Sequence, residues 1–148
     1  MRVFVAYGGP EAEAIAKRVH TFLQENKVEA YVAPNDNPAG EWDPRVQGAL
    51  KRADVFLVVC CPNSLKRRDL FKEVILATEW NLTFETFLDG RVDKYNTRFP
   101  RKMRDSDIVT FERRNPDAKF KEVLDKIEGV AGDVLYRRVE PEEPVKVR

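Results

Sequence analysis

One uninterrupted apolar run, at residues 55–61, constrains the fold of this chain more than any other feature. All seven residues, VFLVVCC, suit burial, which is typical of a strand covered on both faces of a parallel sheet. The run ends at Pro62-Asn63-Ser64, a basic loop follows at residues 65–68, and a helical segment begins near Asp69. This order of strand, polar loop and helix is typical of α/β proteins, which bind ligands beside the carboxyl ends of their strands.

The same alternation of strand and helix repeats along the first half of the chain. We expect strands at residues 3–7, 28–32 and 55–61. Helices are expected at residues 11–26, from Pro44 after the cap residue Asp43, and from Asp69 into the early 80s. In the third helix the core-facing residues are expected to be Leu70, Val74, Ile75, Thr78 and Leu82. Crossovers of this length predict an open, mostly parallel, flavodoxin-like α/β sheet with helices on both faces.

The second half of the chain carries weaker patterns. We expect a strand near residues 95–99, a further strand at residues 108–111, and a final helix that begins after Asn115-Pro116 and ends at Gly129. Residues 131–148 are polar and are predicted to form a tail or linker, with one short strand at residues 134–136. The predicted domain therefore covers residues 1–130.

Composition places limits on the partners and the compartment. The 148 residues suit one domain, and a formal net charge of +1 favours neither nucleic acid nor a membrane surface as a partner. The two cysteines, Cys60 and Cys61, are adjacent. Neighbouring side chains in a strand point to opposite faces, so these two do not readily form a disulfide with each other. Two buried thiols fit a reducing, cytoplasmic environment, and no metal site is predicted from them.

Three loops are expected to meet at the carboxyl edge of the sheet and to bind the substrate. The first loop is Tyr7-Gly8-Gly9, and its glycines let a ligand approach the backbone closely, although a tight turn explains them equally well. Trp42 could stack on a planar ring or pack into the core. The predicted substrate-binding residues are Tyr7, Gly8 and Gly9 from the first loop, Asn35, Asp36, Gly40 and Trp42 from the second, and Ser64 from the third.

Glu73, one turn into the third helix, is the candidate catalytic residue. Its side chain is either a solvated group at the positive end of the helix dipole or a carboxylate that faces the cleft. In both interpretations we expect it to be largely exposed, so that Glu73→Ala leaves the fold intact. Glu79 lies six residues further and on another face, so a pair of catalytic carboxylates with Glu79 is not supported. The lone histidine, His20, lies outside the three loops, which excludes a Ser-His-Asp site.

Taken together, these motifs resemble the Toll/interleukin-1 receptor (TIR) domain family over roughly residues 2–127. Residues 3–7 resemble its first strand, residues 39–42 the glycine and aromatic end of its BB loop, and residues 55–64 its third strand and the turn that follows. Lys72-Glu73-Val74 resembles the helix that carries the glutamate of the NAD-cleaving members, and residues 99–127 resemble the last strand and helix. Many members have an aromatic residue four positions before this glutamate, where the chain has Asp69.

The resemblance to the microbial NAD-cleaving branch implies an NAD⁺ glycohydrolase that acts in defence or cell-death signalling. Glu73 would hold the ribose and stabilise positive charge as nicotinamide leaves, Trp42 would stack near a ring of the nucleotide, and Tyr7, Gly8 and Gly9 would line the pocket. The products would be nicotinamide and ADP-ribose or a cyclic form. NAD⁺ is the substrate, so no separate cofactor is expected. The family also implies self-association through TIR–TIR contacts, and a missing sensor domain or partner protein.

Two other functions stay open. The chain could be a non-catalytic TIR signalling or scaffold module that acts by self-association. It could also be related to the nucleoside 2-deoxyribosyltransferases, whose related fold likewise places a glutamate on a helix after a strand. Turnover of NAD⁺ distinguishes an NAD⁺ glycohydrolase from a signalling or scaffold module. Transfer of deoxyribose between bases would identify a deoxyribosyltransferase.

Overall fold

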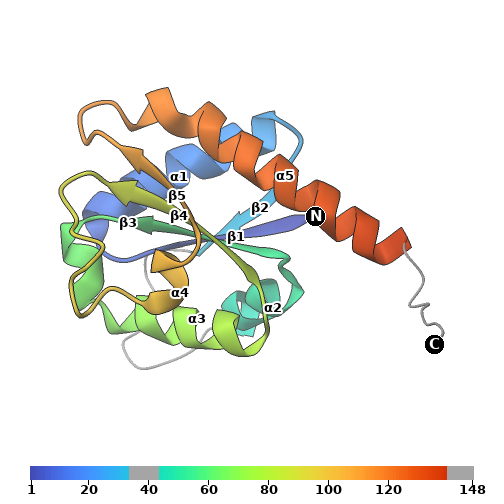
Figure 1. Cartoon of the computed structure of the whole chain (residues 1–148), viewed down its shortest axis with the longest axis horizontal. Helices are drawn as coiled ribbons and strands as arrows, with labels where there is room; N and C mark the ends of the chain where they lie inside the picture. Colours follow the sequence, from blue (N-terminus) through green and yellow to red (C-terminus); the bar gives the residue numbers. More distant parts are fainter. Residues whose placement is uncertain (34–43, 140–148) are drawn as a thin grey trace.

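A five-stranded parallel sheet organises the protein (Figure 1). The computed structural model describes residues 1–33 and 44–139, with side chains up to residue 132. The strands lie in the order β2-β1-β3-β4-β5, and every neighbouring pair is parallel. The strands are β1 (Arg2–Tyr7), β2 (Glu29–Val32), β3 (Val55–Cys60), β4 (Thr83–Asp89) and β5 (Asp107–Phe111). The predicted parallel α/β sheet is confirmed.

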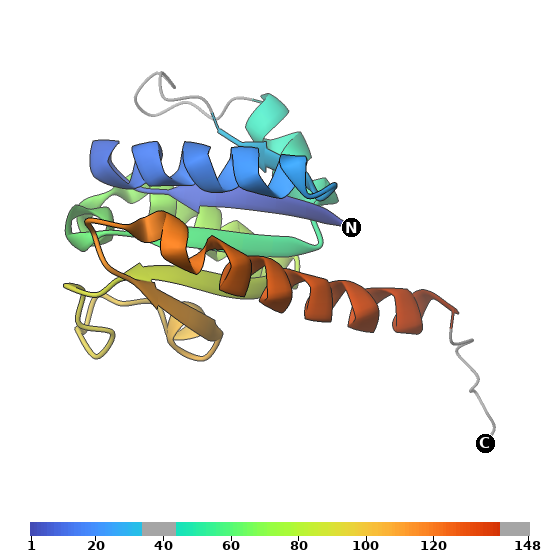
Figure 2. The same cartoon turned by 90° about the horizontal axis from the view of Figure 1, so that it is seen from above.

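Helices cover both faces of this sheet (Figure 2). The two faces have separate cores: Val3 and Val5 of β1 belong to the core under α1 and α5, and Phe4 and Ala6 to the core over α2, α3 and α4. The longer helices are α1 (Pro10–Glu25), α2 (Pro44–Arg52), α3 (Arg68–Glu79) and α5 (Phe120–Val139); the shorter ones are α4 (Arg101–Arg104) and the 3-10 helices η1 (Pro62–Lys66) and η2 (Pro116–Lys119).

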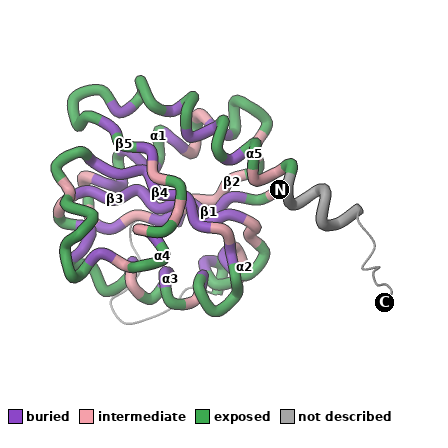
Figure 3. The backbone as a smooth tube through the Cα atoms, in the orientation of Figure 1, coloured by how far each residue is buried: buried purple, intermediate pink, exposed green. Residues whose placement is uncertain are grey.

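The central strand β3 is buried at every position, as its apolar sequence predicts (Figure 3). It pairs with β1 on one side and β4 on the other, and helices cover both of its faces. Chain order reverses between β1 and β3, because β2 lies outside β1 while β4 and β5 follow β3. A crevice that binds ligands is expected at this reversal, beside the carboxyl ends of β1 and β3.

The fourth strand lies elsewhere than predicted. β4 covers Thr83–Asp89, and residues 95–99 instead form turns, with Asn96 N–H bonded to Asp93 O and Phe99 N–H to Asn96 O. The pattern was hard to recognise because β4 alternates apolar residues with Glu85 and Asp89, and these two carboxyl groups are buried. A strand with buried charged residues lacks the apolar signal by which buried strands are found.

The end of the last helix was also predicted wrongly. α5 continues through Gly129 to Val139, and residues 134–136 belong to this helix and not to a strand (Figure 2). Glycine ends a helix when its backbone adopts positive φ, but Gly9 is the one glycine with positive φ among the described residues. The predicted domain limit at residue 130 falls inside α5, and the division into a domain and a tail stays a prediction.

Ile75 corrects the predicted core-facing side of α3. Leu70 and Val74 are buried as expected, whereas Ile75 is 57% exposed and Thr78 is also exposed. Ala77 and Glu73 complete the buried stripe. Burial therefore follows the positions 70, 73, 74 and 77 of the helix, and this stripe includes the candidate catalytic residue.

Candidate functional site

Ser64 joins the carboxyl ends of β1 and β3, where a crevice is expected. Its hydroxyl donates a hydrogen bond to the Gly8 carbonyl oxygen at 2.7 Å and accepts one from the Cys61 N–H at 2.9 Å. Ser64 is fully buried, so these bonds tie the end of β1 to the turn after β3 inside the protein. The burial favours a positioning role for Ser64; direct contact with a substrate stays a prediction.

Gly8 leaves no space for a side chain at this junction. A Cβ atom at Gly8 would lie 3.1 Å from the backbone oxygen of Ser64 and 3.2 Å from Cβ of Arg67, the residue that precedes α3. Gly9 has φ +93°, a conformation that other residues rarely adopt, and it precedes Pro10 at the start of α1. The two glycines therefore allow β1, η1 and α3 to meet closely at the crevice.

Tyr7 extends the site toward β2. Its hydroxyl donates a hydrogen bond to the Ala33 carbonyl oxygen at 2.8 Å, which joins the end of β1 to the residue after β2. The side chain is half-buried. The remaining predicted contacts in the second loop, Asn35, Asp36, Gly40 and Trp42, lie outside the described residues, so their part in a site stays a prediction.

Glu73 is buried, contrary to our expectation that it is largely exposed. Its exposed fraction is 8%, because it lies on the stripe of α3 that packs toward the sheet. Burial, and secondly the charge of Asp69, raises the pKa of the Glu73 carboxyl to about 8. Within the described part of the chain, no side chain forms an ion pair or hydrogen bond with this carboxyl group. A buried carboxyl group on the helix after a central strand, with a raised pKa, is a candidate functional group.

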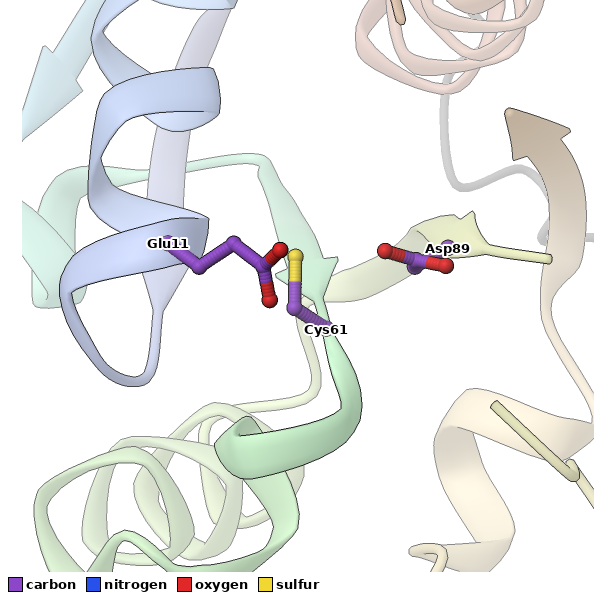
Figure 4. A group of neighbouring side chains, drawn as sticks. All are labelled: Glu11, Cys61 and Asp89. Atoms are coloured by element: carbon purple, nitrogen blue, oxygen red, sulfur yellow. The ribbon is translucent and has the colours of Figure 1, made fainter. Parts of the chain in front are cut away.

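A second group of charged side chains lies at the carboxyl edge, on the α1 face of the sheet (Figure 4). Glu11, Cys61 and Asp89 converge from α1, the end of β3 and the end of β4, with one ligand atom of each within 4.8 Å of the others. The sequence prediction missed this group because β4, which ends in Asp89, was not recognised. A polar residue at the carboxyl end of a strand was the signal that could have found it.

The carboxylates of this group already form ion pairs with arginines. Arg91 Nη2 donates to Asp89 Oδ2 at 2.7 Å and to Glu11 Oε2 at 2.8 Å, and Arg113 Nε lies 3.0 Å from the same Glu11 oxygen. Burial acts to raise the pKa of Asp89, but the hydrogen bonds from Arg91 outweigh it and hold the pKa below its ordinary value. The group is thus a network that links α1, β4 and the loop after β5.

Cys61 is unsuited to nucleophilic chemistry in this network. Burial, followed by the charges of Asp89 and Glu11, raises the pKa of its thiol to about 12. Burial and then Asp89 also raise the pKa of Cys60 to about 12. Because the thiolate is the reactive form, both cysteines are inert side chains of the core at neutral pH.

A sequence model of the TIR domain matches residues 3–124. The chain belongs to the TIR domain family. A comparison with curated proteins found no match. Among the helices of the described residues, none has both the length and the apolar composition that a membrane crossing requires.

Two solved structures resemble this TIR domain. One is the CMP N-glycosidase BcmB of Clostridium botulinum, with a TM-score of 0.54 and 15% identity over 83% of this chain and 98% of that chain. The other comprises the TIR domains of the activated Roq1 resistosome, which directly recognises the pathogen effector XopQ. Its TM-score is 0.53, with 14% identity over 88% of this chain and 76% of that chain. At these identities the likeness shows the flavodoxin-like TIR fold alone.

Proposed function

We propose that this TIR domain is an NAD⁺ glycohydrolase with Glu73 as its catalytic residue. The observation that carries the proposal is the burial of the Glu73 carboxyl on α3, the helix after β3, with no ion pair or hydrogen bond to it among the described side chains. Burial makes ionisation of Glu73 costly in the free protein, and a cation placed against it reverses that cost. NAD⁺ supplies such a cation, because its nicotinamide ring carries a positive charge.

The reaction fits a site with one carboxylate and no separate general acid. The bond between nicotinamide nitrogen and ribose C1′ breaks, and its electron pair neutralises the ring, so the leaving group needs no proton. Positive charge develops on the ribose, where the Glu73 carboxylate stabilises it. Water then adds to C1′ and releases a proton, giving nicotinamide, ADP-ribose and H⁺; attack by an atom of the same nucleotide would give a cyclic product instead.

The ligand would enter at the carboxyl edge between β1 and β3. Gly8 and Gly9 would let the backbone approach it closely, Tyr7 would border it on the β2 side, and Trp42 of the second loop would stack on a ring. We propose that consumption of NAD⁺ serves microbial defence or cell-death signalling in the cytoplasm. A sensor domain or partner protein would control it, and self-association would complete the site.

Nicotinamide release tests this function. Concentrated protein is incubated with NAD⁺, and the products are separated for wild type, Glu73→Gln and the exposed control Glu79→Gln. We expect release by wild type and by Glu79→Gln, and a loss of at least about a hundredfold in Glu73→Gln, the usual size for removal of one electrostatic catalytic group. Equal rates in all three proteins would refute the role of Glu73, and no release by any of them under crowding would refute the enzyme.

Two alternatives have their own support. The fold shared with the TIR domains of the activated Roq1 resistosome favours an assembly module, which sedimentation of Glu73→Gln at rising concentration would reveal without any turnover. The fold shared with a CMP N-glycosidase favours cleavage of a nucleotide whose base is uncharged. Release of cytosine from CMP, or transfer of deoxyribose between bases, would support that class of enzyme in place of an NAD⁺ glycohydrolase.

A further inference from the structure

Asp69 shares one side of α3 with Glu73. The two residues are four positions apart, so their Cβ atoms lie roughly 6 Å from each other on neighbouring helical turns. α3 follows β3, and its first residues therefore lie at the carboxyl edge of the sheet. Asp69 is exposed and closer to that edge, while Glu73 is buried one turn further along. A ligand that enters at the edge meets Asp69 before Glu73.

Basic residues surround this pair but do not neutralise it. Arg67, Arg68 and Lys72 are exposed, and within the described residues none of them forms an ion pair with Asp69 or Glu73. Among the charged groups of the described residues, Asp69 is the one whose charge raises the pKa of Glu73, after burial. Asp69 therefore places one negative charge a turn before the buried Glu73 carboxyl, whose pKa of about 8 keeps it protonated at neutral pH in the free protein.

We propose that Asp69 is a specificity-determining residue, which together with Glu73 selects N-glycosides whose leaving group carries a positive charge. This inference rests on the proposed function and deepens it. A positively charged pyridinium ring gains the attraction of Asp69 and favours ionisation of Glu73, whereas a neutral base of the same size gains neither. Asp69 acts through its charge as the ligand binds, and Glu73 acts on the ribose as the bond breaks.

NAD⁺ and NADH separate charge from shape, because they differ by the charge of one ring. Binding is measured by titration calorimetry in the Glu73→Gln background, so that NAD⁺ is not consumed. In this background the single variant is compared with a double variant that also carries Asp69→Asn. A second double variant with Glu79→Gln, on the same helix, is the matched control for the loss of one charge. We expect Asp69→Asn to weaken NAD⁺ binding by about fivefold, the effect of one charge several ångströms away in a partly solvated site.

The same substitution should leave the Kd for NADH within about twofold, and raising the salt from about 50 to 500 mM should reduce the preference for NAD⁺. Equal weakening of both ligands, no change in either, or no binding of either ligand would overturn the inference. Nicotinamide release by the chain with Glu73 intact is scored separately. A preserved charge preference without release refutes hydrolysis but not the role of Asp69, and release without a preference refutes the role of Asp69 alone.

Discussion

Glu73→Gln is expected to stabilise the protein at alkaline pH while it abolishes catalysis. The folded state raises the pKa of the carboxyl group from 4.5 to about 8, chiefly by burial. Between these values the folded protein holds a proton that the unfolded chain has released. The free energy of unfolding of wild type therefore falls as the pH rises through this window. Below the window Glu73 has no effect on it, and above the window the reduction stays constant. Glutamine has a similar shape and no charge, so it avoids the penalty.

The size of the effect follows from the two pKa values. The shift from 4.5 to about 8 corresponds to a penalty of roughly 1 kcal/mol at pH 5, about 3 kcal/mol at pH 7 and 4–5 kcal/mol at pH 9, at 1.36 kcal/mol per unit. The advantage of Glu73→Gln over wild type should thus grow by about 4 kcal/mol between pH 5 and pH 9. This is a large share of the stability of a small domain, which is typically about 5–15 kcal/mol.

Urea unfolding at pH 5, 7 and 9 measures this difference directly. Wild type, Glu73→Gln and the exposed control Glu79→Gln are compared at each pH, and the difference between proteins cancels the titration of all shared groups. The control should track wild type within about 0.5 kcal/mol, as is usual for surface substitutions. An advantage of Glu73→Gln that is independent of pH, or a loss of stability at pH 9, would refute the burial of an ionisable Glu73 carboxyl.

Three further substitutions test the surrounding structure. Ser64→Ala should cost about 2–3 kcal/mol in urea unfolding, because the Gly8 carbonyl and the Cys61 N–H lose their bonds to its hydroxyl inside the protein; an unchanged midpoint would contradict this. Gly8→Ala should cost about 1–3 kcal/mol by crowding Ser64 and Arg67, whereas its control Gly129→Ala, with open space around it, should gain up to about 1 kcal/mol. Arg91→Ala should lower the melting temperature more than Arg101→Ala, because Arg91 pairs with a buried carboxylate and Arg101 with an exposed one. Adding Asp89→Asn to Arg91→Ala should restore the melting temperature by removing the buried charge. Equal effects at the two arginines would refute the network.

The sheet was largely predictable because its signals are local. The apolar runs of β1 and β3 and the helical periodicity between them are properties of neighbouring residues, and the parallel order follows from the length of the crossovers. The predicted cap residue Asp43 lies outside the described residues. β4 escaped recognition because Glu85 and Asp89 are buried within it. Burial, followed by Asp107, raises the pKa of Glu85 to about 7, a state that depends on residues more than 20 positions away.

The candidate site was predictable only in its location. Gly8, Ser64 and Glu73 follow the strands whose carboxyl ends meet, so the sequence places them at one edge of the sheet. Their roles depend on packing: Ser64 uses its hydroxyl to hold Gly8, 56 residues earlier in the chain, and Glu73 is buried although a charged residue one turn into a helix is usually solvated. Neither contact leaves a periodic signal in the sequence.

By itself, the amino-acid sequence determined the parallel α/β architecture, the edge at which a site is expected and the residue types available there, since these follow from local periodicity and from strand order. The tertiary structure decided which carboxyl groups are ionised. Arg91 keeps Asp89 charged, while burial and the neighbouring Asp69 favour the protonated form of Glu73. The physical reason is that the cost of a charge depends on solvent and on partners brought together by the fold, and a linear sequence specifies neither directly.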